Sequence, residues 1–159
     1  MNKHDRYFND SCKRLNDSIY KTTVDGKDYI VKDLDLEVIK KVMDINFWGT
    51  VYCTKYAINE LLNRSGSVVG ISSIAGFKGL PGRTGYSASK FAVNGFFEAL
   101  RIENLKNNLH VMVACPGFTA SNIRNVALNN SAKPQGESSM VEEKMMSSQE
   151  VAIRIVDGV

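Results

Sequence analysis

The sequence of 159 residues has few cysteines, few histidines and no long apolar run. Its three cysteines, Cys12, Cys53 and Cys115, are widely spaced, which excludes a disulfide framework and a CxxC metal site. His4 and His110 have no carboxylate or cysteine at ligand spacing, so we expect no metal site. No segment approaches the roughly 18 uncharged apolar residues of a membrane span, and residues 1–10 contain no apolar signal region. We therefore expect a soluble, cytoplasmic protein without a membrane partner.

The sequence also lacks a large excess of charge of either sign. Its 20 Lys and Arg against 17 Asp and Glu leave a formal charge of +3. These charges are spread along the chain without a basic run, so nucleic acid is not an expected partner. Apolar residues make up 43% of the chain, which is enough to bury a core and argues against disorder as the dominant state.

Residues 1–33 differ in character from the rest of the chain. They are rich in Lys, Asp and Asn and contain few apolar residues before Tyr29. A single turn signal, Asp25-Gly26, separates two short β-branched runs. This composition predicts an atypical polar arm or small hairpin over 1–33, followed by one α/β segment over 34–159.

From residue 34 onward, helical and strand-like patterns alternate. They predict a long helix, a buried strand, a second long helix and a second buried strand, at 36–63, 67–72, 87–107 and 110–115. Residues 76–85 hold four glycines and a proline, which predicts a loop. Ser147 and Glu150 have the spacing of a capping box that opens a last helix. This order of elements is typical of right-handed crossovers in a parallel α/β sheet.

Three residues with useful chemistry lie around the first strand and the second long helix. Tyr86 and Lys90 are four residues apart, so they share one helix face, where a nearby ammonium favours the phenolate form of a tyrosine. Ser73 follows the first buried strand, at the edge where an open α/β sheet places its ligand site. Spacing alone is equally consistent with simpler roles. Tyr86 and Lys90 could be an ordinary pair on the helix surface, and Ser73 could only form hydrogen bonds with the backbone.

The residues themselves make the pattern more specific. Tyr86-Ser-Ala-Ser-Lys90, with Ser73 thirteen residues upstream of the tyrosine, resembles the active-site signature of the classical short-chain dehydrogenase/reductase superfamily. Asn46 on the first long helix and Pro116-Gly117 after the second strand match further motifs of that family. The resemblance covers about residues 34–128.

The resemblance implies a Rossmann-like fold, NAD or NADP as the cofactor, and a small carbonyl or alcohol substrate. Tyr86 would be the general acid/base, Lys90 would favour its phenolate and bind the nicotinamide ribose, Ser73 would hold the substrate oxygen, and Asn46 would fix a water leading to Lys90. The expected cofactor-binding residues are Asn46, Tyr86, Lys90, Pro116, Gly117, and either Thr119 or Ser121. The choice between the last two, for the nicotinamide carboxamide, stays open.

The resemblance also exposes what is missing. Family members carry a Gly-rich phosphate-binding turn and an Asn-Asn-Ala-Gly turn, yet the first 45 residues contain only Gly26. We therefore expect a chain truncated at both ends: a partial, doubly wound parallel sheet that keeps the C-terminal catalytic half and largely lacks the N-terminal dinucleotide-binding half. Such a sheet would expose an unpaired edge and leave one face without helices.

Two functions from different classes follow from these residues. One is an NAD(P)-dependent oxidoreductase of the short-chain type, in which the stretch 122–146 would be the substrate-covering loop. The other is a truncated, non-catalytic remnant that only self-associates or binds full-length relatives. The resemblance implies a homo-oligomer through helices 36–63 and 87–107. A reading-frame error over 1–33 is a further alternative.

Overall fold

The computed structural model describes residues 35–80, 82–122 and 145–159. The predicted arm over 1–33 and most of the predicted loop over 122–146 lie outside the described residues. In chain order the elements are α2 (Leu36–Met43), the π-helical turn η2 (Asp44–Trp48), α3 (Gly49–Asn63), β1 (Ser67–Ile71), the 3-10 turn η3 (Ile74–Gly76), α4 (Thr84–Glu103), β2 (His110–Ala114), β3 (Thr119–Ala120), β4 (Met146–Ser147) and α6 (Ser148–Asp157).

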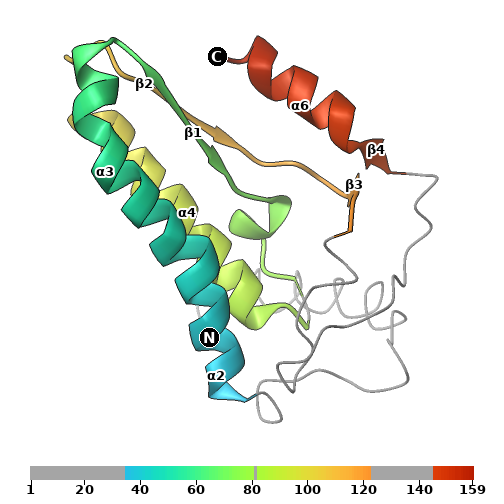
Figure 1. The fold of residues 1–159 in the computed structure, drawn as a ribbon. Helices are drawn as coiled ribbons and strands as arrows, with labels where there is room; N and C mark the ends of the chain where they lie inside the picture. The colour runs from blue at the N-terminus through green and yellow to red at the C-terminus, as the bar shows by residue number, and fades with distance from the viewer. Residues whose placement is uncertain (1–34, 81, 123–144) are drawn as a thin grey trace, which may run out of the picture.

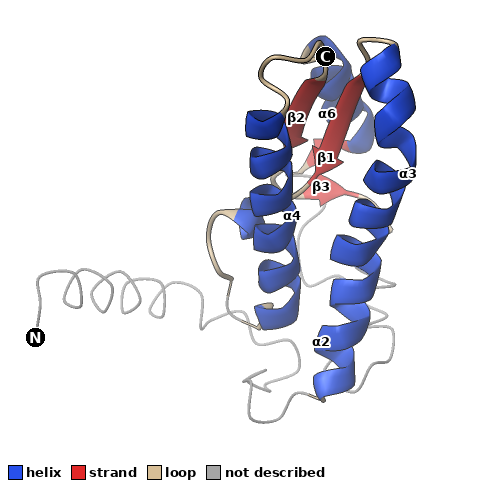
Figure 2. Cartoon of the chain, turned by 90° about the vertical axis from the view of Figure 1, so that its left-hand side faces the viewer, coloured by secondary structure: helices blue, strands red, loops and turns tan. Residues whose placement is uncertain are grey.

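The larger sheet consists of β1 and β2, which pair in parallel with Ser67 opposite His110. Helix α4 connects the two strands, as expected for a βαβ crossover. Helices α3 and α4 lie on one face of this sheet, and α6 lies on the other (Figures 1 and 2). The α/β class with helices on both faces of a parallel sheet is therefore confirmed.

The core lies between α4 and the sheet. Val93 and Phe97 of α4 are buried against Val111 of β2 and Leu109, which directly precedes β2. The Phe97 ring lies directly over Gly70 of β1, because a Cβ atom added there would come within 2.5 Å of the ring. Glycine at this position lets the helix approach the strand closely.

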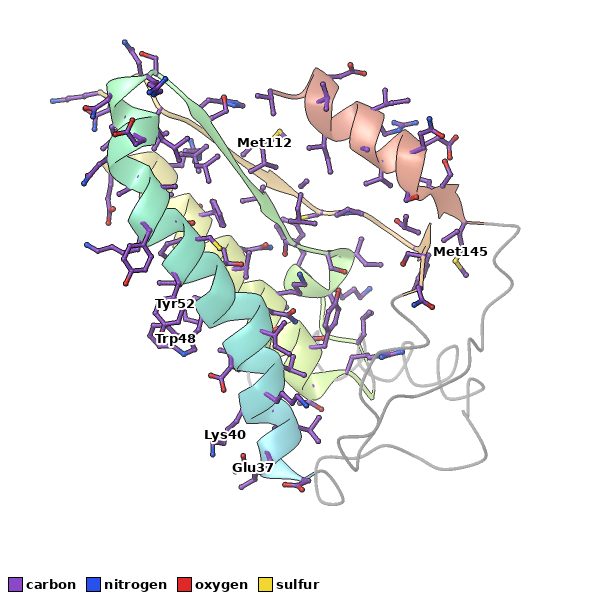
Figure 3. The ribbon with its side chains drawn as sticks, in the orientation of Figure 1. Glu37, Lys40, Trp48, Tyr52, Met112 and Met145 are labelled. Atoms are coloured by element: carbon purple, nitrogen blue, oxygen red, sulfur yellow. The ribbon has the colours of Figure 1, made fainter. Side chains whose placement is uncertain are left out.

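The opposite face of the sheet is covered at its upper end by α6. A Cβ atom added at Gly158 would lie 2.9 Å from the sulfur of Met112 on β2, so the end of α6 packs on that strand (Figure 3). The expectation that one face would have no helix is therefore wrong. The predicted capping box opens this helix, since Ser147 and Glu150 exchange hydrogen bonds.

The two long helices lie where the sequence predicts them, but the first is less regular than expected and the second has different bounds. The helix expected over 36–63 contains the π-helical turn η2 in its middle. The helix expected over 87–107 begins and ends earlier, at Thr84 and Glu103. Its end is explained by Asn104, whose side-chain amide donates to the Leu100 carbonyl at 2.8 Å and so closes the last turn. Of the residues predicted as a loop over 76–85, Thr84 and Gly85 belong to this helix.

Candidate active site

Ser73 lies in the turn that follows β1. Beyond the last residue of the strand, the Ser72 amide still donates to the Ala114 carbonyl at 2.7 Å, which continues the pairing with β2. Ser73 then caps η3, because its Oγ accepts a hydrogen bond from the Ala75 amide at 3.2 Å. The side chain is half-buried at the carboxyl end of the strand. The hydroxyl is thus held in place by accepting one bond, while the described residues give its hydrogen no acceptor.

Tyr86 and Lys90 lie in the first turns of α4, with Lys90 Nζ 5.7 Å from the centroid of the Tyr86 ring. Both side chains are half-buried. Lys90 Nζ also donates to the carbonyl of Ile71, the last residue of β1, at 2.9 Å. The predicted proximity of the tyrosine and the lysine is therefore present, and the lysine reaches the strand end beside Ser73.

Burial is the main influence on the ionisation of Lys90. Removal of its ammonium from water lowers the pKa of Lys90 below 10.5, and the neighbouring Cys115 partly offsets this effect. Cys115 follows the last residue of β2, so the carboxyl ends of both strands meet at Lys90. The result is one cation in a half-buried position at the sheet edge where a Rossmann-like fold places its ligand.

Asn46 lies in η2 and reaches α4 through one serine. Its side-chain amide donates to Ser89 Oγ at 3.0 Å, and Ser89 Oγ donates to the Tyr86 carbonyl at 2.7 Å. The Asn46 carbonyl accepts a hydrogen bond from Thr50 Oγ1 at 2.7 Å. The structure therefore connects Asn46 to the helix turn that carries Tyr86 and Lys90.

The segment after β2 approaches the Ser73 turn. The Ile74 amide points to the Pro116 carbonyl at 3.4 Å, which brings Pro116-Gly117 beside η3. Thr119 lies in β3, which pairs with β4 in parallel, and its hydroxyl donates to the Gly117 carbonyl at 3.2 Å. Ser121 is exposed just beyond β3.

Three residues that sequence patterns did not single out hold these groups together. Ser89 is fully buried and bridges Asn46 and Tyr86. Ser72 Oγ donates to the Lys90 carbonyl at 3.3 Å, and Asn94 donates to the Gly76 carbonyl at 3.0 Å. Serine and asparagine are common on helix surfaces and in turns, so only the fold distinguishes these three.

The described ranges contain no group of three or more His, Cys, Asp or Glu side chains that could hold a metal ion. Over the same residues, no helix has both the length and the apolar character needed to cross a bilayer.

The parallel α/β sheet, with Ser73 and Lys90 at the end of β1, gives the described residues a Rossmann-like fold. The family model described as "short chain dehydrogenase" matches residues 19–132. The chain therefore belongs to the short-chain dehydrogenase family. The predicted family is confirmed, and the region of resemblance, 34–128, lies within the matched residues.

Curated relatives agree with this membership. The chain is 35% identical over 130 residues to mouse "Dehydrogenase/reductase SDR family member 7B", covering 81% of this chain and 40% of the mouse protein. It is also 35% identical over 136 residues to zebrafish "3-dehydrosphinganine reductase", covering 85% of this chain and 40% of that protein. The chain thus spans about two fifths of the length of these relatives.

Solved structures show the fold. A short-chain dehydrogenase from Salmonella enterica serovar Typhi has a TM-score of 0.66 at 24% identity and matches 77% of this chain and 47% of its own. A 4-hydroxyisoleucine dehydrogenase complexed with NADH has a TM-score of 0.62 at 23% identity, with 79% and 53% covered. The partial Rossmann-like fold is therefore confirmed.

Proposed function

We propose that this chain forms the catalytic part of an NAD(P)-dependent oxidoreductase that interconverts a ketone or aldehyde and an alcohol. The observation that carries the proposal is the position of Lys90 Nζ, 5.7 Å from the Tyr86 ring centroid and bonded to the end of β1 at 2.9 Å. This arrangement puts a cation, a phenol and the Ser73 turn at one edge of the sheet. Membership of the short-chain dehydrogenase family supports the same class of reaction.

In this reaction Tyr86 acts as the general acid/base. When a carbonyl is reduced, the phenol of Tyr86 gives its proton to the carbonyl oxygen, and when an alcohol is oxidised the phenolate takes that proton back. The Ser73 hydroxyl donates a hydrogen bond to the substrate oxygen, and its acceptor bond from Ala75 holds it in place for this. The ammonium of Lys90 stabilises the phenolate electrostatically.

The residues near Lys90 fit the nicotinamide ribose end of NAD(P). An ammonium and a phenol supply the donors that ribose hydroxyls accept, and the peptide after β2 lies beside them. The residues that would hold this end are Asn46, Tyr86, Lys90, Pro116, Gly117, and Thr119 or Ser121. Bound nicotinamide would supply or accept the hydride. The first 45 residues hold a single glycine, so no residue is assigned to the pyrophosphate.

Cofactor titration of the purified chain tests the proposal. We expect NADH or NADPH fluorescence to change on binding. Tyr86→Phe removes one proposed donor to the ribose, so it should weaken that binding but not abolish it, and it should lose oxidoreduction of a panel of small ketones, aldehydes and alcohols. Tyr56→Phe, at an exposed position of α3, is the matched control and should behave like the wild type. Failure to bind either cofactor would exclude the activity for this chain while leaving its family unchanged.

The alternative, a non-catalytic chain that associates with itself or with full-length relatives, is favoured by one feature of the helix formed by η2 and α3. Trp48, Tyr52 and Tyr56 follow each other at one-turn spacing and are 44%, 56% and 85% exposed. Trp48 stacks on Tyr52 with ring centroids 5.8 Å apart, and both point away from the sheet (Figure 3). An exposed aromatic row of this kind is typical of a contact surface.

Sedimentation velocity tests this alternative. The wild-type chain should form a dimer, alone or with a full-length relative, and Tyr52→Arg should shift it to monomer. Lys55→Arg on the same helix is the control for a neutral surface change. A wild-type chain that stays monomeric in both experiments would count against it. We propose a cytoplasmic location for either function, which fractionation of cells expressing the chain would check.

A further inference from the structure

We infer that Asn94 is a positioning residue that ties the Ser73 turn to α4 and so fixes Ser73 relative to Tyr86 and Lys90. The inference rests on the proposed function, because it assigns Asn94 a part in the geometry of that site. It is carried by three contacts between α4 and the turn over residues 72–76, which contains Ser73 and η3 and lies beside α4 (Figure 1).

The first contact is the hydrogen bond from Asn94 Nδ2 to the Gly76 carbonyl, 3.0 Å long. Asn94 lies one helical turn after Lys90, and Gly76 lies three residues after Ser73. The bond therefore joins the far end of the Ser73 turn to the helix that carries Tyr86 and Lys90. Beyond Gly76, the next hydrogen bond from this segment to α4 is the one that the Leu80 amide donates to Ser87 Oγ at 3.2 Å, four residues further along the chain.

The second contact joins the near end of the turn. Ser72 Oγ donates to the Lys90 carbonyl at 3.3 Å, and Ser72 is buried. Ser73 is thus bracketed by two bonds to one helix, from the residue before it and from the residue three positions after it. A turn fixed at both ends keeps the orientation of the side chain between them, which is the requirement for precise placement of a catalytic hydroxyl.

The third contact is steric. A Cβ atom at Gly76 would lie 2.6 Å from Ser72 Oγ, 2.8 Å from Asn94 Nδ2 and 3.0 Å from the Lys90 carbonyl oxygen. All three neighbours are atoms of the same two hydrogen bonds. Gly76 therefore allows the turn to approach α4 closely enough for both bonds to form.

The oxygen of the Asn94 amide indicates that a contribution to stability is not the whole reason for an asparagine at this position. Its Oδ1 atom is buried and finds no hydrogen-bond partner among the described residues. A buried acceptor without a partner is unfavourable and needs an explanation. The orientation of the amide is nevertheless fixed, because exchange of the two atoms would place Oδ1 against the Gly76 carbonyl oxygen. A bond that positions the Ser73 turn supplies that explanation.

Hydrogen exchange measured by mass spectrometry on Asn94→Leu tests the inference without any cofactor. We expect exchange of the 72–78 peptide to rise roughly tenfold or more, because the turn opens locally, while the 110–114 peptide of β2 keeps its protection. Asn104→Leu is the matched control, since it removes a side-chain bond to the Leu100 carbonyl on the same helix, far from Ser73. This control should leave the 72–78 peptide unchanged. An equal rise in both peptides of Asn94→Leu would show a general structural role and overturn the inference.

A second variant keeps the test decisive where Asn94→Leu does not fold. Gly76→Ala should raise hydrogen exchange in the 72–78 peptide, because its Cβ would push apart the partners of the Asn94–Gly76 and Ser72–Lys90 hydrogen bonds. Gly79→Ala, where an added Cβ meets nothing within 4 Å, should not raise it. Unchanged exchange in Gly76→Ala would overturn the inference.

Turnover supplies the readout that separates this inference from the proposed function. If the wild type oxidises or reduces a substrate, Asn94→Leu should lower kcat by roughly 10- to 100-fold and leave the cofactor Kd within about twofold, because the bond acts on Ser73 geometry. An unchanged kcat would overturn the inference even with the activity intact. A wild type without turnover contradicts the proposed function, and the exchange experiment then decides the role of Asn94 alone.

Discussion

Lys90 Nζ donates a hydrogen bond to the carbonyl oxygen of Ile71 at 2.9 Å and thereby fastens α4 to the last residue of β1. The bond connects the two parts of the site, since Ser73 lies two residues beyond Ile71 and Tyr86 one turn before Lys90. It is formed in a half-buried position, where holding a charge is unfavourable. The site therefore keeps the Lys90 ammonium in a position where burial makes the charged form less favourable than in water.

Because burial disfavours the charged form of Lys90, we predict that the folded chain becomes more stable at alkaline pH and that this gain depends on Lys90. Burial lowers the pKa of Lys90 in the folded chain below the 10.5 of an exposed lysine. At pH values between the pKa of Lys90 in the folded chain and 10.5, the unfolded chain binds more protons than the folded chain. The free energy of unfolding therefore increases with pH over this range. Urea unfolding from neutral pH to 10.5 should show this increase in the wild type and not in Lys90→Met.

Lys55→Met, on the exposed side of α3, is the control and should keep the wild-type pH dependence. Parallel pH profiles for the wild type and Lys90→Met would contradict the prediction.

Gly70→Ala should destabilise the chain by about 1–3 kcal/mol, because its Cβ would come within 2.5 Å of the buried Phe97 ring and force the helix away from β1. Gly95→Ala on α4 is the matched control. Nothing lies within 4 Å of its added Cβ, so the substitution should stabilise the helix by about 0.5–1 kcal/mol. Thermal unfolding followed by circular dichroism measures both, and a stable Gly70→Ala would mean that Phe97 does not lie over this strand.

The capping box of α6 predicts an acid-side effect. Hydrogen bonds from the backbone and hydroxyl of Ser147 lower the pKa of Glu150 below 4.5. A carboxyl with a lowered pKa stabilises the fold above 4.5 and loses this effect as the pH falls through its folded value. Ser147→Ala removes the hydroxyl bond and keeps the larger backbone one, so it should cost about 1 kcal/mol of helix capping near neutral pH and reduce, but not abolish, the loss of stability in acid. Unchanged acid unfolding would show that α6 does not contribute to the cooperative unit.

The order of the elements could be predicted from local patterns. Buried β-branched runs mark β1 and β2, and three- and four-residue apolar spacing marks the helices, because these periods depend only on which face is buried. The π-helical turn that carries Asn46 could not be predicted, since the apolar spacing through Asp44–Trp48 stays close to that of an α-helix. The early end of α4 depends on the Asn104 side chain, which apolar spacing does not register.

The contacts within the candidate site were predictable from spacing only where residues near in sequence act together. Tyr86 and Lys90 are one helical turn apart, so their proximity follows from helix geometry. The contacts of Asn46 with Ser89 and of Asn94 with Gly76 join residues 43 and 18 positions apart, and they exist only because the helices and the β1 turn pack together. Spacing contains no information about such contacts.

Ser89 links Asn46 to Tyr86, which predicts a specific effect of its removal. Its hydroxyl accepts from the Asn46 amide at 3.0 Å and donates to the Tyr86 carbonyl at 2.7 Å, and the side chain is fully buried. Ser89→Ala leaves the Asn46 amide without this acceptor, so unfolding should become easier by about 1–3 kcal/mol. The side-chain amide signal of Asn46 in nuclear magnetic resonance spectra should also lose its protection from solvent exchange. The opposite substitution at the exposed neighbouring position, Ala88→Ser, is the matched control and should alter neither measurement. An Asn46 signal unaffected by Ser89→Ala would mean that η2 and α4 are held together by apolar packing alone.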